Sequence, residues 1–289
     1  MGIKKPLVLE VAHRTYAINE FGMATCFLLW GTERGLLIDT GCGMYNIREI
    51  ADELCPLPYD VVITHSHGDH YGYMDAWDEV WIHPDDIPNL TDEKLAAWKN
   101  RPTTYLDMMA TYGTTEAYEV TQEQCHHPEH APKLIPCPEG TVFDLGGGRK
   151  VDVIHTPGHS EGEIVLIDPT TRILFSGDAC NGNLGIHSTS MNKALKGLLK
   201  VKAREADFDR NFNAHIGYGG DTVHKSQVDG ILDDCLYIMT GLVKGTIKPE
   251  YTPNPWRPGS APVYLVKHGN VVITCDPDNI IGEDEEPAV

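Results

Sequence analysis

The sequence of 289 residues predicts an α/β fold, and three observations support this prediction. The chain opens with short β-rich runs at 7–12, 25–31 and 35–41, each bounded by glycine or acidic residues. Apolar residues at helical spacing over 44–54 are followed by a short buried strand at 60–65, which together form a strand, helix, strand unit. Strand and helix patterns then return in the second half of the chain.

The middle of the chain has a different pattern. Two helices are predicted at 92–100 and 103–113, and an irregular stretch follows at 125–140. We interpret the whole segment 83–140 as an insertion that covers a site and selects substrate, because long segments within compact domains are more often functional than idle. The insertion contains several aromatic and methionine residues, which either face that site or pack against one another in a small core of the insertion. These residues are Trp98, Tyr105, Met108, Met109, Tyr112 and Tyr118.

The second half of the chain predicts a further sheet with helices. Four β-rich runs follow one another within 141–178, and a helix is expected near 191–206. A strand at 211–217 and a helix from about 222 to 243 come next. A hairpin at 262–276 closes the fold, because its central Gly-Asn pair suits a tight turn.

The predicted domain organisation is simple. The chain shows no short-period repeat and no low-complexity linker, so we expect one domain over 1–289, with 83–140 as its insertion. The acidic end, 283–289, is expected to be a flexible tail.

Charge and composition narrow the class of protein. The hydrophobic content of 41% is that of an ordinary globular protein, and the formal net charge of −19 would repel phosphate backbones. We therefore expect a small-molecule substrate and no nucleic-acid partner. No apolar stretch approaches the roughly 20 residues that span a bilayer, so no membrane partner is expected either. The oligomeric state has no signature in the sequence.

Cysteine usage and the first residues suggest a location. The eight cysteines include no C-x-x-C pair, which is typical of reduced thiols rather than a disulfide framework. The opening residues 1–14 lack the hydrophobic region of a secretory signal. We therefore expect a cytoplasmic protein.

The segment THSHGDHYG at 64–72 has the strongest chemical signature. It follows a predicted strand, and alternate residues of an extended segment face the same side, so His65 and His67 can aim both imidazoles at one point. If the chain turns into a helix at Gly68, then Asp69 and His70 can reach a second ion nearby. Imidazole suits zinc or iron. The segment therefore predicts a metal site at the carboxyl end of a strand, where α/β sheets bind ligands.

Three later loops offer further ligands at strand ends. His159 ends a Pro-Gly turn in HTPGHSEGE, Asp178 ends LFSGD, and His215 stands in NAHIGYGG. Taken alone, a Pro-Gly turn or a polar residue at the end of a strand is common in proteins and indicates no function. Their order and their shared setting after strands make them candidate ligands.

Taken in this order, the residues resemble the signature of the metallo-β-lactamase-fold hydrolase superfamily, which is His-x-His-x-Asp-His followed by a single His, a bridging Asp and a last His. The resemblance extends from about 36–41 to 213–217 and implies an αββα sandwich with two adjacent metal ions. It implies one ion held by His65, His67 and His159, the other held by Asp69, His70 and His215, and Asp178 bridging them. It also places Asp39 close beneath the site, where a buried carboxylate orients ligands.

The resemblance implies a hydrolase. Two divalent ions are expected, most simply Zn²⁺ because the donors are nitrogen and oxygen, with Mn²⁺ or Fe²⁺ as substitutes. The expected reaction is attack by a hydroxide bridging ions about 3.5–4 Å apart on a small ester, lactone or thioester. Asp69 is the candidate to pass the proton to the leaving group, unless it is a ligand only.

Other functions on the same fold stay open. Quorum-sensing lactonases of the superfamily place a tyrosine shortly after the bridging aspartate, where this chain has Cys180 and Asn181. Flavodiiron oxidoreductases carry a Glu where this chain has His67, and persulfide dioxygenases lack a functional last histidine, for which this chain has His215. The alternatives are an iron-dependent oxidoreductase or dioxygenase, and a non-catalytic metal-binding regulator. Such regulators usually lose ligands, and none is missing here.

A second histidine-rich segment, CHHPEH, competes as a metal site. It offers Cys125, His126, His127 and His130, but no predicted strand supports it. We expect a loop with solvated histidines.

Overall fold

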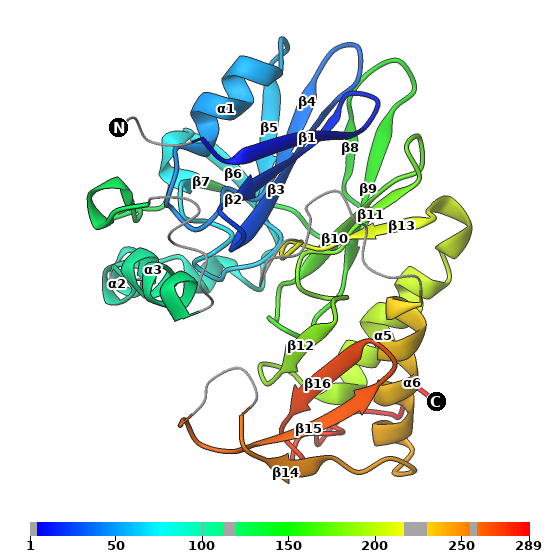
Figure 1. Cartoon of the computed structure of the whole chain (residues 1–289). Helices are drawn as coiled ribbons and strands as arrows, with labels where there is room; N and C mark the ends of the chain where they lie inside the picture. The colour runs from blue at the N-terminus through cyan, green and yellow to red at the C-terminus, as the bar shows by residue number, and fades with distance from the viewer. Residues whose placement is uncertain (1–4, 100, 112–119, 217–229, 255–258) are drawn as a thin grey trace.

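The computed structural model describes residues 5–99, 101–111, 120–216, 230–254 and 259–289. Its strands form three sheets, of seven, five and four strands. Figure 1 shows the first two sheets together in the upper half of the view and the third below them, beside two long helices.

The first sheet has the order β1-β2-β3-β4-β5-β6-β7. Its first four strands pair antiparallel, and β4 to β7 pair parallel. Helix α1 (Ile47–Leu54) makes the crossover from β4 to β5, as the pattern at 44–54 predicts. The bounds of the strands are β1 Leu7–Ala12, β2 Thr15–Glu20, β3 Ala24–Trp30, β4 Gly35–Ile38, β5 Tyr59–Val62, β6 Glu79–Ile82 and β7 Lys133–Pro136.

Three of these strands, β2, β6 and β7, were not among the predicted elements. β7 lies inside the stretch 125–140 that the sequence pattern marked as irregular. It is only four residues long and ends at Pro136, which is tolerated because β7 is an edge strand. Short edge strands give little periodicity to read.

The second sheet has the order β13-β11-β10-β9-β8. The side chains of β10 alternate, so that Ile164 and Leu166 pack against the first sheet while Val165 and Ile167 face the helices. The predicted strands within 141–178 and at 211–217 are therefore confirmed. Their bounds are β8 Val142–Asp144, β9 Lys150–His155, β10 Ile164–Asp168, β11 Ile173–Phe175 and β13 Arg210–Phe212.

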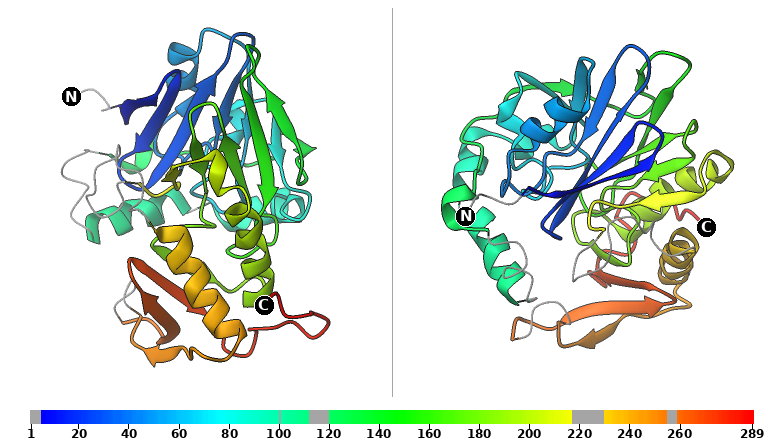
Figure 2. Two further views of the ribbon diagram at one scale, coloured as in Figure 1. Left: turned by 90° about the vertical axis from the view of Figure 1, so that its right-hand side faces the viewer. Right: turned by 45° about the horizontal axis from the view of Figure 1, so that its top comes forward.

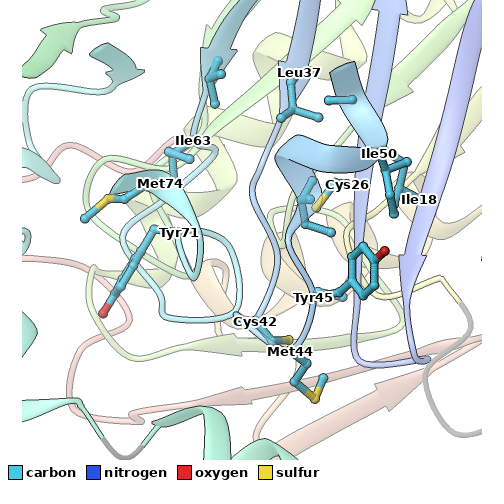
Figure 3. Packing of buried hydrophobic residues seen from close by; sticks show 14 of the residues in the cluster. Ile18, Cys26, Leu37, Cys42, Met44, Tyr45, Ile50, Ile63, Tyr71 and Met74 are labelled. Atoms are coloured by element: carbon cyan, nitrogen blue, oxygen red, sulfur yellow. The ribbon is translucent and has the colours of Figure 1, made fainter. Parts of the chain in front are cut away.

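An apolar core joins the two sheets face to face. At its centre the ring of Phe27 lies 5.0 Å from that of Phe175 and 5.9 Å from that of Phe212, all three being buried. A second core lies on the outer face of the first sheet, where Leu37 and Ile18 meet Ile50 of α1 (Figure 3). Helices α5 (Met191–Lys202) and α6 (Ile231–Val243) cover the outer face of the second sheet. The layers run helix, sheet, sheet, helix, which confirms the αββα sandwich.

One helix of the second half is shorter than predicted, and the first part of the other lies outside the described residues. The helix expected near 191–206 ends at Lys202, and a short 3₁₀ turn follows. The helix expected from about 222 begins at Ile231, while 217–229 lie outside the described residues. The 3₁₀ turns of the described chain are η1 Met74–Ala76, η2 Ile87–Asn89, η3 Gln122–Gln124 and η4 Glu205–Asp207.

The third sheet packs on α6 and adds a layer to the sandwich (Figure 2). The predicted hairpin is its centre: β15 (Val263–His268) and β16 (Val271–Cys275) turn at Gly269, which has a φ of 52°. β12 (Asn183–Ile186) and β14 (Glu250–Thr252) extend the sheet and were not predicted. Each has only three or four residues.

The insertion carries helices α2 (Asp92–Ala97) and α3 (Arg101–Thr111), as predicted. Leu95, Tyr105 and Leu106 anchor these helices in the outer core of the first sheet. Apolar contacts therefore fix the insertion on the sandwich.

The acidic end of the chain contacts α5. Glu285 accepts hydrogen bonds from Ser190 Oγ and Asn192 Nδ2, and the Ala288 N–H donates to Asn192 Oδ1. A carboxylate at a helix N-terminus is stabilised by the exposed N–H groups there. The segment 283–289, predicted to be a flexible tail, thus contacts the N-terminal end of α5.

Within the described residues, no helix combines the length and the apolar character needed to cross a bilayer.

A buried ion pair joins the two large sheets at one end of their interface. Arg149 Nη2 donates to Asp168 Oδ2 at 2.6 Å and to Thr15 Oγ1 at 2.6 Å, and Nη1 donates to the Trp30 carbonyl at 2.7 Å. Asp168 is fully buried and Arg149 is 6% exposed. Removing the cation would leave an uncompensated buried carboxylate.

We therefore predict that Arg149→Met lowers the free energy of unfolding by about 3–5 kcal/mol. The matched control is Arg34→Met, which breaks the exposed pair with Asp60 and should cost less than about 1 kcal/mol. Denaturation in urea measures both. Equal losses in the two variants would contradict the role given to Arg149.

Candidate metal centre

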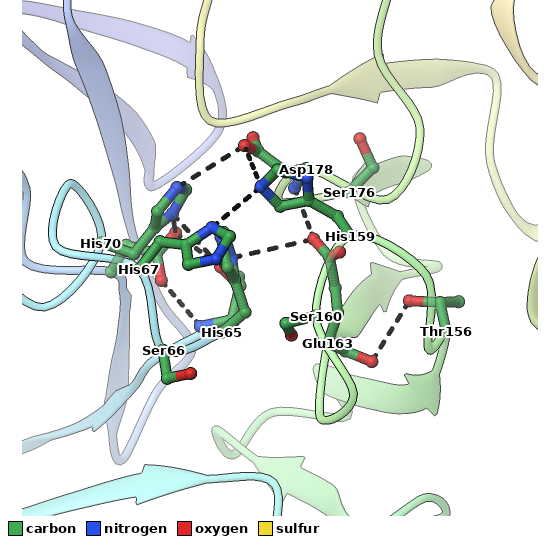
Figure 4. Close-up of polar contacts among 12 residues, drawn as sticks. His65, Ser66, His67, His70, Thr156, His159, Ser160, Glu163, Ser176 and Asp178 are labelled. Carbon is green, nitrogen blue, oxygen red and sulfur yellow. Dashed lines mark hydrogen bonds and ion pairs between the residues drawn. The ribbon is translucent and has the colours of Figure 1, made fainter. Parts of the chain in front are cut away.

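The ends of strands from both large sheets bring the predicted ligand residues together. Figure 4 shows His65, His67, His70, His159 and Asp178 among them. His65 and His67 follow β5, and His159 lies in the loop between β9 and β10. His67 Nδ1 lies 2.9 Å from His65 Nε2 and 2.9 Å from His159 Nε2. Three nitrogens therefore converge on one point.

A second group lies beside the first. Asp69 Oδ2 is 3.9 Å from His70 Nε2 and 3.5 Å from His215 Nε2. Asp178 Oδ2 stands between the groups, 3.4 Å from His159 Nε2 and 3.1 Å from His215 Nε2. All seven residues predicted as ligands are thus neighbours. Three groups of three have ligand atoms within 4.8 Å of one another, namely His65, His67 and His159, then His65, His70 and Asp178, and then Asp69, His70 and His215.

The ring nitrogens that face away from the centre have oxygen partners. These pairs are His70 Nδ1 with Asp39 Oδ2 at 2.8 Å, His159 Nδ1 with the Gly185 carbonyl at 3.0 Å, and His215 Nδ1 with the Met23 carbonyl at 2.7 Å. A histidine that donates from one nitrogen presents a lone pair on the other, as metal-binding histidines do. Each of these rings thereby aims Nε2 into the cluster.

Two buried atoms of the cluster have no hydrogen-bond partner within the described chain, namely His70 Nε2 and Asp178 Oδ1. Unpaired buried polar atoms are costly and rare in folded proteins. A lone pair and a carboxylate oxygen left in this way fit a cation, and the nitrogen and oxygen donors suit zinc.

Asp39 lies beneath the cluster, as predicted. Its backbone has a φ of 63°, a left-handed conformation that aspartate tolerates better than most residues. Its carboxylate accepts hydrogen bonds from the backbone N–H of Thr64 at 2.7 Å and from the Thr64 hydroxyl at 2.9 Å, besides its bond with His70. Asp39 thereby connects the end of β4 to the histidine-rich loop.

Burial and nearby charges shift the pKa values of the candidate ligands in opposite directions. Burial, reinforced by His70, lowers the pKa of His65 well below its usual value. Burial also acts on His215, but the charge of Asp178 and the hydrogen bond to it raise the pKa of His215 to about 10. The pKa of Asp178 is well below its usual range because His215 outweighs burial. A divalent cation would displace the proton of His215.

Asp86 holds the two histidine loops together and was not predicted. It is fully buried, and its carboxylate accepts hydrogen bonds from the Ser66 N–H at 2.8 Å, the Ser160 hydroxyl at 2.8 Å and the Gly162 N–H at 2.9 Å. Asp86 lies just beyond β6, a parallel strand beside β5. The reasoning from strand ends applied to β5 would have found it there.

Two buried glutamates also support the site and were not predicted. Glu163 Oε1 accepts a hydrogen bond from the Asp178 N–H at 2.7 Å and lies 3.8 Å from His65 Nδ1, and burial raises its pKa well above the usual value. Glu20 accepts hydrogen bonds from backbone N–H groups of loop 42–45, and burial raises its pKa to about 7. Neither position has a sequence signal that indicates this role.

A pocket of about 1130 Å³ opens above the cluster. The insertion contributes Asn89, Lys94, Trp98 and Tyr105 to one wall. Asn183, Ile231 and Asn270, from the region of the third sheet and α6, contribute to another. Of the other aromatics expected here, Tyr112 and Tyr118 lie outside the described residues, as do the side chains of Met108 and Met109.

The histidines of the CHHPEH segment have separate partners. His126 pairs with Asp75 at 2.7 Å, His127 with the Leu95 carbonyl at 2.8 Å, and His130 with Asp92 at 2.9 Å. Their ring nitrogens therefore do not converge in the structure.

One further group, His83, Asp85 and His155, has ligand atoms within 4.8 Å of one another. The two imidazoles stack with centroids 3.8 Å apart and an interplanar angle of 14°. Since lone pairs lie in the ring plane, stacked rings do not aim at a common ion.

We predict that Asp86→Ala weakens zinc binding about 10- to 100-fold, because both histidine loops lose their shared acceptor. Titration against a chromogenic chelator measures the affinity. The neighbouring Asp85→Ala is the matched control, since the Asp85 side chain is 52% exposed, and it should bind zinc like the unmodified protein. Unchanged zinc affinity in a folded Asp86→Ala variant would refute this role.

The comparisons with known proteins agree with this architecture. Among curated proteins, the chain is similar to the acyl-coenzyme A thioesterase MBLAC2 of Gallus gallus, with 32% identity over 165 residues, which are 54% of this chain and 57% of that protein. It is also similar to the atrochrysone carboxyl ACP thioesterase nsrC of Aspergillus novofumigatus, with 27% identity over 56% of this chain and 39% of that protein. The chain thus matches 57% of the length of the first relative and 39% of the length of the second.

A solved structure is similar over a longer span. It is a metallo-β-lactamase family protein from Thermus thermophilus, with a TM-score of 0.52 and 17% identity, and the match covers 83% of this chain and 85% of that chain. At this identity the likeness concerns the fold. The family model of the metallo-β-lactamase superfamily matches residues 19–181, which is more than half of the sequence and includes six of the seven candidate ligands. The chain therefore belongs to the metallo-β-lactamase superfamily.

Proposed function

We propose that this chain is a metal-dependent hydrolase that cleaves acyl thioesters. The observation that carries the proposal is the convergence of seven histidine and aspartate side chains at the floor of the large pocket. Among the described residues, His70 Nε2 and Asp178 Oδ1 have no hydrogen-bond partner. The choice of thioesters is supported by the two thioesterases among the relatives.

In this proposal His65, His67 and His159 hold one ion, Asp69, His70 and His215 hold the other, and Asp178 binds both. Two zinc ions bound there would activate water and polarise the acyl carbonyl. The set has no thiolate: Cys180 is fully buried, and its Sγ accepts a hydrogen bond from Asn211 Nδ2 at 3.5 Å. We infer that residues 1–289 act as one unit, since pocket residues come from all parts of the chain.

The reaction adds water across the acyl–sulfur bond, so the C–S bond breaks and a carboxylic acid and a thiol leave. Asp69 lines the pocket and is the candidate to carry the proton to the leaving sulfur. A thiol with a pKa of about 8.5 leaves more readily than an alcohol, so this proton transfer is less demanding for thioesters than for esters.

The pocket's size and composition suit an extended acyl thioester. Its volume exceeds the range of roughly 300–1,000 Å³ usual for small-molecule sites. Trp98, which is 52% exposed, offers apolar surface for an acyl chain, while Asn183 and Asn270 offer amides for polar groups. A small rigid lactone would leave most of this space empty.

We predict that the zinc-loaded protein releases thiol from S-hexanoyl-N-acetylcysteamine faster than it hydrolyses the matched oxyester, a homoserine lactone or a phosphodiester. A thiol-reactive chromophore follows the first reaction, and pH-stat titration follows the others. Thiol release no faster than in buffer with zinc alone would reject the proposal. One iron per chain with consumption of oxygen would favour an oxidoreductase instead.

We also predict different outcomes for two ligand replacements. Asp178→Ala should lower kcat at least about 1,000-fold and reduce the metal content, because the carboxylate shared by both ions is lost. His215→Ala should leave about one tightly bound ion per chain, since only one subsite loses a ligand. Metal analysis and thiol release measure both. Retention of two ions and near-normal activity in Asp178→Ala would disprove the bridging assignment.

A further inference from the structure

The insertion touches the candidate metal centre at one carboxylate. Tyr105 of α3 is 2% exposed, and its hydroxyl donates a hydrogen bond to Asp69 Oδ1 at 3.1 Å. The other oxygen of the same carboxylate, Oδ2, faces His215 Nε2 at 3.5 Å and His70 Nε2 at 3.9 Å. The two oxygens of Asp69 therefore serve different partners, one in the insertion and one in the second ligand group.

We propose that Tyr105 is a positioning residue for the second metal subsite, and that its bond to Asp69 couples the insertion to occupancy of that subsite. This inference rests on the ligand assignment of the proposed function. The insertion is then a working part of the metal centre as well as a wall of the pocket.

Packing fixes the position of the Tyr105 hydroxyl independently of this bond. Leu95 and Leu106, on α2 and α3, are buried in the same outer core as the Tyr105 ring. The donor is therefore held in place before Asp69 accepts from it, which is the arrangement that orients a ligand efficiently.

The bond matters because the carboxylate torsion is soft. The χ2 angle of aspartate has a broad distribution, so an unrestrained Asp69 would sample orientations that turn Oδ2 away from His70 and His215. Loss of a partner that orients a ligand costs about 10- to 100-fold in metal affinity.

The coupling has to act in both directions. If the Tyr105 bond strengthens binding of the second ion, then that ion must favour the docked position of α3 by the same factor. Metal binding should therefore protect the backbone of α2 and α3 from hydrogen exchange, although neither helix contains a ligand.

The test compares Tyr105→Phe with Tyr59→Phe. Both variants keep the ring and lose a phenol–carboxylate hydrogen bond, and the Tyr59 bond, to Asp52 Oδ1 at 2.6 Å, lies on the exposed side of α1. Stepwise zinc titration gives two dissociation constants for each protein. In Tyr105→Phe we expect the weaker one to rise about 10-fold or more, with the tighter one within about 2-fold. Tyr59→Phe should match the unmodified protein.

Hydrogen exchange of peptides from α2 and α3, with and without zinc, is the second measurement. The unmodified protein and Tyr59→Phe should gain protection on loading the second ion, and Tyr105→Phe should gain clearly less. Unchanged dissociation constants in a folded Tyr105→Phe variant, or a single zinc site in the unmodified protein, would overturn the inference.

The same proteins separate this inference from the proposed function. If the unmodified protein hydrolyses no thioester but Tyr105→Phe still weakens the second ion, then the proposed substrate class is wrong and the coupling stands. If thioesters are hydrolysed and Tyr105→Phe binds both ions normally, then the coupling is wrong and the function stands.

Discussion

The structure depends on holding loops from two different sheets in one position. The histidine-rich loop follows β5 of the first sheet, while the loop of His159 joins two strands of the second. The apolar interface between the sheets is non-directional and cannot alone fix how far one sheet slides over the other. The three directed hydrogen bonds to the buried carboxylate of Asp86 supply that precision at the site.

A second polar clamp stands at the opposite end of the same interface. Arg149 precedes β9 and Asp168 ends β10, whereas the site lies where β9 ends and β10 begins. The guanidinium also bonds the Trp30 carbonyl at the end of β3, so it reaches the first sheet. Apolar contacts between the clamps supply most of the stability, and the two clamps fix register. Because the clamps and the apolar contacts hold the fold, the ligand cluster can keep His70 Nε2 and Asp178 Oδ1 without hydrogen-bond partners among the described residues.

The sequence identified the candidate ligands because metal chemistry constrains residue type and spacing together, and the structure places these side chains side by side. The order of the residues from His65 to His215 suggested their assignment, and the β-rich runs within 141–178 and the Gly-Asn hairpin followed from local rules. Asp86, Glu20 and Tyr105 could not be assigned their roles, since a residue that orients another acts through a contact distant in sequence. Short strands such as β12 and β14 exist because a neighbour pairs with them, and these two strands of the third sheet were missed for that reason.

The insertion contacts the site through two residues with different roles, Asp86 and Tyr105. Near its start, Asp86 sets the separation of the two histidine loops, and in its helices Tyr105 sets the orientation of Asp69. The same helices supply Trp98 and Lys94 to the pocket wall. In the function that we propose, a change in the insertion that alters the pocket would also act on the candidate ligands, through the buried contacts of Asp86 and Tyr105. Substrate preference and metal geometry would then be linked through the insertion.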